Sequence, residues 1–164
     1  MIGIVDYGLG NVKAFANIYK RLGLSFCVIS SVPDFKKVSK IILPGVGAFD
    51  WAMTCLQKSG LRGALDDQVL CAQKPVLGVC VGMQIMARTS DEGALPGLDW
   101  IDSKITKFDS NVSRGNYPVP HMGWNNATHL NAESLFNGID RPTFYFLHSY
   151  YMEPRNREHI LANS

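Results

Sequence analysis

Short apolar runs and helical repeats alternate along the first half of the chain. The runs are as short as buried strands usually are, and they cover residues 2–6, 24–29, 40–43 and 75–79. Apolar residues at helical spacing occupy the segments between them, from Val12 to Leu22, from about Phe49, over residues 61–72 and over residues 81–87. This alternation predicts an α/β fold with a mostly parallel sheet flanked by helices.

The second half of the chain lacks these helical repeats. Its strand-like segments at residues 100–108, 124–130 and 143–151 follow one another without helices, which predicts an antiparallel extension of the sheet. A last apolar stretch at residues 159–162 resembles the start of a further strand, after which the sequence stops in mid-pattern. Neither a repeat nor a linker interrupts the pattern. We therefore expect one domain over residues 1–164, incomplete at its C-terminus.

Composition and charge narrow the classes of function. The formal net charge is +2 and 18% of the residues are charged, which does not suit a protein that binds nucleic acid or an anionic membrane surface. Met1 leads directly into a strand-like run without a secretory leader, and the four cysteines show neither a CxxC pair nor zinc-ligand spacing. We expect reduced thiols in a cytoplasmic protein with no metal site and no cofactor.

One cysteine has a distinctive setting. The pentapeptide Gly78-Val79-Cys80-Val81-Gly82 follows an apolar strand-like run and precedes a helical one, as a nucleophile elbow does. The glycines allow a tight turn and close packing of strand against helix, and the free N–H groups of the helix favour negative charge on the sulfur. The alternative is a buried structural cysteine, but the position between strand and helix favours Cys80 as a nucleophile.

Acyl transfer by a cysteine also needs an oxyanion hole and a base. The N–H of Val81 is one candidate oxyanion donor, and the turn Pro44-Gly45-Val46-Gly47 at the end of the neighbouring strand is a candidate for another. His121 lies in a polar loop and His148 follows an apolar run. The histidines all lack an adjacent Pro-Glu, and we interpret them as structural or substrate-orienting: His121, His129, His148 and His159. The base therefore stays unassigned.

Five segments of the chain form an ordered pattern that spans residues 2 to about 151. They are Asp6-Tyr7-Gly8-Leu9-Gly10-Asn11, Pro44-Gly45-Val46-Gly47-Ala48-Phe49, Gly78-Val79-Cys80-Val81-Gly82-Met83-Gln84, His121-Met122-Gly123-Trp124-Asn125 and His148-Ser149-Tyr150-Tyr151. With these segments the chain resembles the class I (triad) glutamine amidotransferases. Within that class it is similar to the glutaminase subunits of imidazole glycerol phosphate synthases of histidine biosynthesis. The resemblance implies a flavodoxin-like α/β fold.

The resemblance also implies a reaction and a partner. Cys80 would attack the side-chain amide of glutamine and form a glutamyl thioester, with ammonia leaving before water releases glutamate. The implied oxyanion donors lie at Val46 and Val81, and the implied glutamine site comprises Gly47, Gln84, His148, Ser149 and Tyr150. A heterodimer with a (βα)8-barrel cyclase subunit is implied, and the residues expected to face it are Asn11, His121, Met122, Gly123, Trp124 and Asn125.

One departure from the family pattern leaves alternatives open. The Phe-His-Pro-Glu type segment that carries the family's catalytic histidine and glutamate has no counterpart here. We interpret the sequence as truncated rather than as a shortened relative, and expect little turnover from these residues alone. The alternatives are a paralogous amidotransferase subunit serving another synthase, for example in surface-sugar biosynthesis, a non-catalytic docking subunit, and a redox-sensing or protease-like cysteine protein. The last gives no role to residues 7–11 or 121–125.

Overall fold

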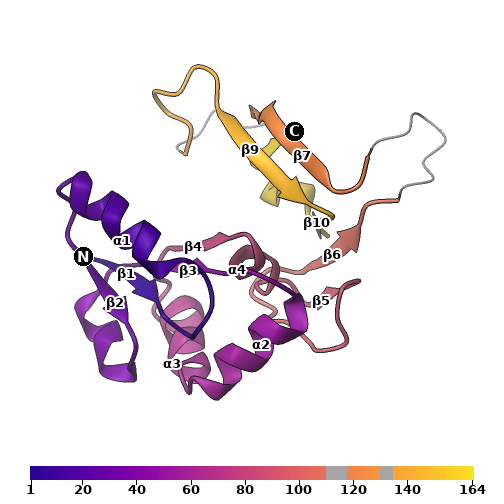
Figure 1. Ribbon diagram of the computed structural model, residues 1–164. Helices are drawn as coiled ribbons and strands as arrows, with labels where there is room; N and C mark the ends of the chain where they lie inside the picture. The colour runs from indigo at the N-terminus through magenta and orange to yellow at the C-terminus, as the bar shows by residue number, and fades with distance from the viewer. Residues whose placement is uncertain (110–117, 130–134) are drawn as a thin grey trace.

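The computed structural model describes residues 1–109, 118–129 and 135–164 (Figure 1). Its main sheet is parallel, with the strand order β2-β1-β3-β4, and these strands span Phe26–Ile29, Ile2–Val5, Lys40–Pro44 and Val76–Val79. The strands lie almost wholly within the apolar runs that predicted them, because parallel strands covered on both faces need apolar residues at successive positions. Glycine-rich turns follow the carboxyl ends of β1 and β3, and the Cys80 elbow follows β4.

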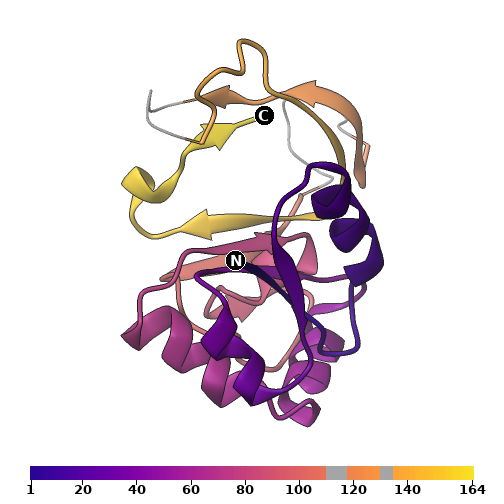
Figure 2. The ribbon, with the colours of Figure 1, turned by 90° about the vertical axis from the view of Figure 1, so that its left-hand side faces the viewer.

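Helical segments cover both sides of this sheet (Figures 1 and 2). They are α1 (Val12–Arg21), the 3-10 helix η1 (Val32–Lys37), α2 (Phe49–Lys58), α3 (Arg62–Asp66), its π-helical continuation η2 (Asp67–Cys71) and α4 (Val81–Gln84). The strand order steps one way from β1 to β2 and the other way from β3 to β4. Right-handed crossovers therefore place α1 on one face and α2 with α3 on the other.

The predicted helix over residues 81–87 ends early, at Gln84. Backbone N–H groups of a later segment donate to carbonyl groups that would otherwise accept hydrogen bonds from the next turn of the helix. The N–H of Leu98 donates to the Ile85 carbonyl at 2.8 Å, and the N–H of Trp100 donates to the Met86 carbonyl at 3.0 Å. These bonds satisfy the end of α4 without further helical residues.

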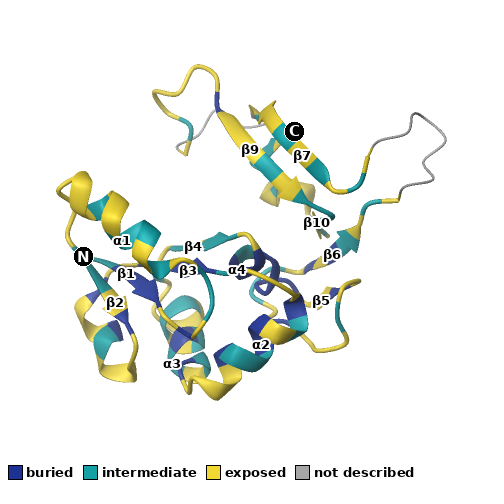
Figure 3. Cartoon of the chain, in the orientation of Figure 1, coloured by how far each residue is buried: buried dark blue, intermediate teal, exposed yellow. Residues whose placement is uncertain are grey.

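The core lies between the parallel sheet and the pair α2 and α3 (Figure 3). Fully buried side chains come from both layers: Val5, Ile29, Ile41, Leu43, Phe49, Leu56, Leu65 and Ile85. By contrast, α1 carries no buried residue. The tightest packing is therefore on the α2 and α3 side, beneath the turns that follow β3 and β4.

The later strands form small sheets of their own beside the parallel sheet. They are β5 (Thr89–Ser90), β6 (Ser103–Lys107), β7 (His121–Asn126), β8 (Thr128–His129), β9 (Thr143–His148), β10 (Tyr150–Pro154) and β11 (Ala162–Asn163). β10 pairs antiparallel with β6, which pairs parallel with β5, while β7 with β9 and β8 with β11 form antiparallel ribbons. The α/β fold is confirmed. The predicted extension of the main sheet is replaced by these separate sheets.

Several predicted boundaries were wrong in this region. The predicted strand over residues 143–151 is two strands, because Ser149 turns the chain from β9 to β10. The predicted loop around His121 is part of strand β7, so the strand predicted over residues 124–130 begins earlier. Leu130 lies outside the described residues. A 3-10 helix, η3 (Arg157–His159), precedes β11 where the last strand was expected. None of the helices in the described part of the chain combines the length and the apolar composition that crossing a membrane requires.

Candidate active site

Cys80 lies on a strained turn between β4 and α4. Its backbone dihedrals are φ 56° and ψ −125°, in a region that residues with a side chain rarely adopt. Gly78 and Gly82 suit this turn, because a Cβ on Gly78 would lie 2.5 Å from Met83 Cα and one on Gly82 would overlap the Leu43 carbonyl oxygen. The turn leaves Cys80 exposed at the carboxyl end of β4, the edge at which parallel sheets bind ligands.

Cys80 opens into a pocket of about 270 Å³. Ligand pockets usually measure about 300–1,000 Å³, so this pocket suits a small metabolite. Seven of the predicted site residues line the pocket, and they are Gly47, Cys80, Val81, Gln84, His148, Ser149 and Tyr150. The lining also includes Glu92, Pro120 and Leu147. The main sheet, the loop after β5 and the corner between β9 and β10 therefore converge beside the thiol.

The glycine-rich turn after β3 packs directly on the elbow. A Cβ on Gly45 would overlap the backbone nitrogen of Gly82, so the two turns approach more closely than a side chain at either position would allow. Gly47 has φ +90° and lines the pocket. The Val46 side chain is 57% exposed and is not part of the pocket lining. The role predicted for Val46 therefore rests on its backbone N–H.

Two polar side chains give the pocket hydrogen-bonding capacity. Gln84 is only 7% exposed, and its Oε1 has no hydrogen-bond partner among the described residues, so a donor on a ligand would satisfy a buried acceptor. Glu92 adds a carboxylate, and its Oε2 accepts the N–H of Phe49 at 2.9 Å. Glu92 was not among the predicted site residues, because it follows the two-residue strand β5 in a loop without any periodic pattern.

The ring of His148 is held at both nitrogens. Its Nδ1 lies 2.8 Å from the Tyr150 carbonyl oxygen, and its Nε2 lies 3.0 Å from Nδ1 of His121. A base for Cys80 needs a ring nitrogen that is free to take up the thiol proton. His148 has none in this arrangement, which supports its predicted role in orienting the substrate rather than in accepting the proton.

The residues predicted to face a partner lie at the start of α1 and along β7. Asn11 is exposed and caps α1, with its Oδ1 accepting a backbone N–H at 3.0 Å. The others, His121, Met122, Gly123, Trp124 and Asn125, all belong to β7, where successive side chains point to opposite faces. Met122 and Trp124 are 59% and 70% exposed, whereas His121 contacts His148. Only part of this segment therefore faces outward.

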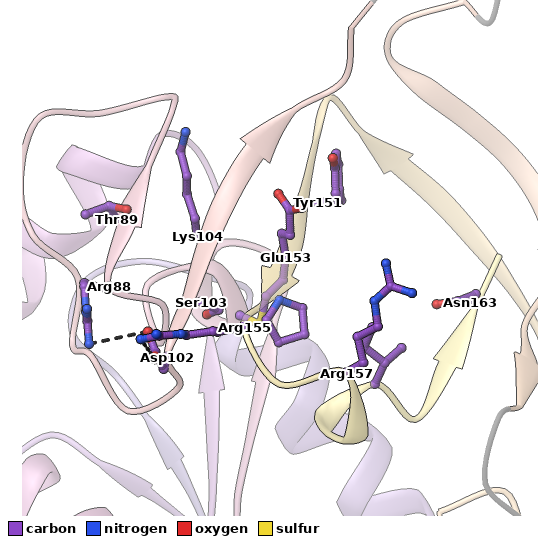
Figure 4. A pocket seen from close by; sticks show the side chains of 13 residues that line it. Arg88, Thr89, Asp102, Ser103, Lys104, Tyr151, Glu153, Arg155, Arg157 and Asn163 are labelled. Carbon is purple, nitrogen blue, oxygen red and sulfur yellow. Dashed lines mark ion pairs between the residues drawn. The ribbon is translucent and has the colours of Figure 1, made fainter. Parts of the chain in front are cut away.

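A larger cavity of about 840 Å³ is formed by β6, β10 and the segment after β10 (Figure 4). Two of its arginines form ion pairs with the same carboxylate, since Asp102 lies 3.4 Å from Arg88 Nη2 and 3.6 Å from Arg155 Nη1. Lys104 likewise lies 2.6 Å from Asp91. Because none of the predicted site residues, Cys80 included, lines this cavity, the smaller pocket is the better candidate for the active site.

Known proteins resemble the chain over nearly its full length. Residues 4–163 match the family described as glutamine amidotransferase class-I. The chain is 47% identical to imidazole glycerol phosphate synthase subunit HisH of Bdellovibrio bacteriovorus, over 100% of this chain and 81% of that protein. It is 47% identical to the subunit of the same name from Leptospira interrogans, over 99% of this chain and 80% of that protein. It is 44% identical to imidazole glycerol phosphate synthase subunit HisH 2 of Pseudomonas aeruginosa, over 99% of this chain and 80% of that protein.

A crystal structure of a glutamine amidotransferase shares the fold. It superposes with a TM-score of 0.74 over 99% of this chain and 79% of that chain, at 14% identity. This likeness concerns the fold alone, whereas the family match and the identities near one half concern the sequence. Together they confirm the resemblance seen in the sequence motifs, and the chain belongs to the class I glutamine amidotransferase family.

Proposed function

We propose that this chain is the glutaminase subunit of an imidazole glycerol phosphate synthase, which hydrolyses glutamine and supplies the ammonia to a cyclase subunit in histidine biosynthesis. The observation that carries the proposal is Cys80 on its φ 56° elbow, open to the pocket that holds Gln84 and residues 148–150. The names of relatives at 44–47% identity support this synthase over a paralogous one.

The proposed reaction begins with attack of the Cys80 sulfur on the amide carbon of the glutamine side chain. The C–N bond then breaks, the thiol proton ends on the departing ammonia, and a glutamyl thioester remains. Water cleaves the C–S bond, restores the thiol and releases glutamate. The N–H of Val81 and the backbone of residues 44–47 are the proposed oxyanion donors, a role supported by the close packing of the two turns.

The pocket also offers partners for the amino-acid end of glutamine. An α-ammonium group needs acceptors, and the pocket supplies the Glu92 carboxylate and the Oε1 of Gln84, which lacks a partner among the described residues. The opposite wall, formed by His148, Ser149 and Tyr150, would orient the rest of the substrate. Gly47 would lie beside the ligand, where the absence of a side chain leaves room. This assignment would give the buried Oε1 of Gln84 a hydrogen-bond donor.

The outer face of the β7–β9 ribbon is the proposed docking surface for the cyclase subunit. Met122 lies opposite Leu147 and Trp124 opposite Tyr145, so these large side chains share one face, and Leu147 also belongs to the pocket lining. They are 59%, 59%, 70% and 53% exposed in that order. An exposed apolar face with Trp and Tyr is typical of a protein interface. Asn11, exposed at the start of α1, is the second proposed contact.

Glutamate release, measured with and without a barrel cyclase subunit, tests the function. In the native protein we expect release that the cyclase stimulates and that Cys80→Ala abolishes. Labelling of Cys80 by a glutamine-derived diazoketone, followed by intact mass, tests the glutamine site separately from turnover. A protein that is labelled and protected by glutamine, but that releases no glutamate in either setting, would be a non-catalytic docking subunit. Labelling that glutamine does not prevent would favour the redox or protease-like alternative.

The docking surface is tested by Trp124→Ala. Central tryptophans of interfaces often contribute at least about 2 kcal/mol, so we expect the dissociation constant for the cyclase to rise by about thirtyfold. Diazoketone labelling of Cys80 in the isolated protein should stay unchanged, because Trp124 faces away from the pocket. Unchanged affinity for the cyclase would place the interface elsewhere.

A further inference from the structure

The inner face of the β7–β9 ribbon carries a chain of hydrogen bonds that ends at the pocket. Asn125 Nδ2 lies 2.5 Å from His121 Nε2, His121 Nδ1 lies 3.0 Å from His148 Nε2, and His148 Nδ1 lies 2.8 Å from the Tyr150 carbonyl oxygen. The carbonyl only accepts, so His148 Nδ1 carries the hydrogen and its Nε2 accepts from His121. His121 Nε2 then accepts from the Asn125 amide. Each ring nitrogen in this arrangement is therefore either a hydrogen-bond donor or an acceptor.

This chain of hydrogen bonds holds the corner at which the backbone changes sheets. β9 ends at His148 and β10 begins at Tyr150, so Ser149 alone forms the corner. The bond from the His148 ring to the Tyr150 carbonyl spans the corner, and the N–H of Phe108 donates to the Ser149 carbonyl at 3.0 Å. The Phe108 ring packs on the His148 ring with 5.2 Å between centroids. The orientation of the pocket wall thus depends on the His148 ring.

The neighbouring residues of β7 lie outside this hydrogen-bond chain. The Oδ1 of Asn126 accepts a hydrogen bond from the Thr143 hydroxyl at 2.8 Å. Met122 and Trp124 point to the opposite, exposed face. Asn126 therefore offers a matched control, since it is an exposed asparagine on the same strand whose hydrogen bond does not lead to the pocket.

We propose that His121 and Asn125 are positioning residues for glutamine binding, which hold the His148 ring and through it Ser149 and Tyr150. This inference rests on the proposed function, because it assigns a role within the same pocket. It also divides the predicted partner-facing segment. Met122 and Trp124 belong to the docking surface, whereas His121 and Asn125 position the pocket wall. One strand therefore links the docking surface to the glutamine site.

Two substitutions of His121 test the role of its hydrogen bond. Asparagine and leucine have nearly the same shape, but the amide nitrogen of asparagine lies roughly where Nδ1 of histidine lies and can donate to His148 Nε2. The measurement is the concentration dependence of Cys80 labelling by the glutamine-derived diazoketone, together with protection by glutamine. Reaction with iodoacetamide reports the intrinsic reactivity of the thiol, and thermal unfolding reports the fold.

We expect the half-saturating concentration of diazoketone to rise about tenfold in His121→Leu, which is the scale of one lost hydrogen bond. In His121→Asn, which keeps the donor, it should stay within about twofold of wild type. The maximal labelling rate and the iodoacetamide rate should not change. Equal half-saturating concentrations in His121→Leu and wild type would overturn the positioning role. Wild-type labelling that neither saturates nor is prevented by glutamine would overturn the proposed function itself, and the inference with it.

A second position keeps the test decisive if His121→Leu does not fold. Asn125 is exposed, so Asn125→Leu is expected to fold and to raise the half-saturating concentration by about threefold, while Asn126→Leu leaves it unchanged. Where both variants fold, the double substitution His121→Leu with Asn125→Leu should cost no more than His121→Leu alone, since linked contacts are non-additive. If Asn125→Leu and Asn126→Leu changed the half-saturating concentration equally, the positioning role proposed for Asn125 would be overturned.

Discussion

The hydroxyl of Tyr7 donates a hydrogen bond to the carbonyl oxygen of Pro44 at 2.8 Å. Tyr7 is only 3% exposed, and Pro44 begins the glycine-rich turn that packs on the Cys80 elbow. The bond therefore anchors the start of the proposed oxyanion turn to the turn after β1.

Removing this anchor should affect both turnover and stability. We expect Tyr7→Phe to lower glutamine turnover about tenfold, less than the loss of a whole oxyanion donor. The free energy of unfolding should fall by about 1 kcal/mol for one lost hydrogen bond. Glutamate release and urea unfolding measure the two effects. Tyr19→Phe, on a tyrosine of α1 that belongs neither to the pocket lining nor to the β7–β9 ribbon, is the control and should change neither. Unchanged turnover in Tyr7→Phe would make the hydroxyl purely structural.

The same hydroxyl predicts how stability depends on alkaline pH. Burial raises the pKa of Tyr7 well above its ordinary value, and the thiols of Cys55 and Cys80 raise this pKa further. Tyrosine in the unfolded chain ionises near a pKa of about 10, while the folded protein keeps the proton to higher pH. Above pH of about 10 the unfolded state therefore gains stability relative to the folded state.

Wild type should thus lose stability more steeply than Tyr7→Phe as the pH rises above about 10, by up to about 1.4 kcal/mol per pH unit. Below that pH the difference between the two proteins should be constant, because Tyr7 is protonated in both states. Urea unfolding at a series of alkaline pH values measures this difference. Parallel curves for the two proteins would mean that Tyr7 ionises as easily in the fold as in the unfolded chain.

Local patterns predicted the parallel sheet and the elbow. The strands β1 and β4 are continuous apolar runs, and β3 is one after its first residue, Lys40. The glycines around Cys80 indicate a close approach of backbones that the structure contains. Both signals lie within a few neighbouring residues, so the sequence carries them without knowledge of tertiary contacts.

Features set by distant contacts could not be predicted in this way. Helix α4 ends at Gln84 because the backbone N–H groups of Leu98 and Trp100 donate to the next carbonyl groups of the chain. The helical repeat in the sequence does not indicate these hydrogen bonds. The apolar run at residues 143–151 conceals the change of sheet at Ser149, since both strands share one alternating pattern. Glu92 reaches the pocket from an irregular loop. In each case the deciding partner is far away in the sequence.

The glycine at position 82 is predicted to be required by contact rather than by chain flexibility. A methyl group in Gly82→Ala would overlap the Leu43 carbonyl oxygen and lie 2.9 Å from the Pro44 carbonyl carbon. Overpacking of this kind costs about 1–3 kcal/mol. Gly63 lies in α3, where a Cβ would meet nothing within 4 Å, and it serves as the control. Gly63→Ala should instead stabilise the protein by about 0.5–1 kcal/mol. Urea unfolding separates the two, and loss of stability in both variants would contradict the contact argument.

The strain at Cys80 predicts that the nucleophile itself reduces stability. A side chain at φ 56° and ψ −125° costs about 1–3 kcal/mol, whereas glycine adopts this conformation freely. Both Cys80→Ala and Cys80→Gly should abolish glutamate release, but Cys80→Gly should be the more stable by about 1 kcal/mol, net of the entropy that glycine loses on folding. Cys71, exposed at the end of η2 and not at positive φ, gives the matched comparison. There the order should reverse, with Cys71→Gly less stable than Cys71→Ala. If alanine were also the more stable choice at position 80, the elbow would not be strained.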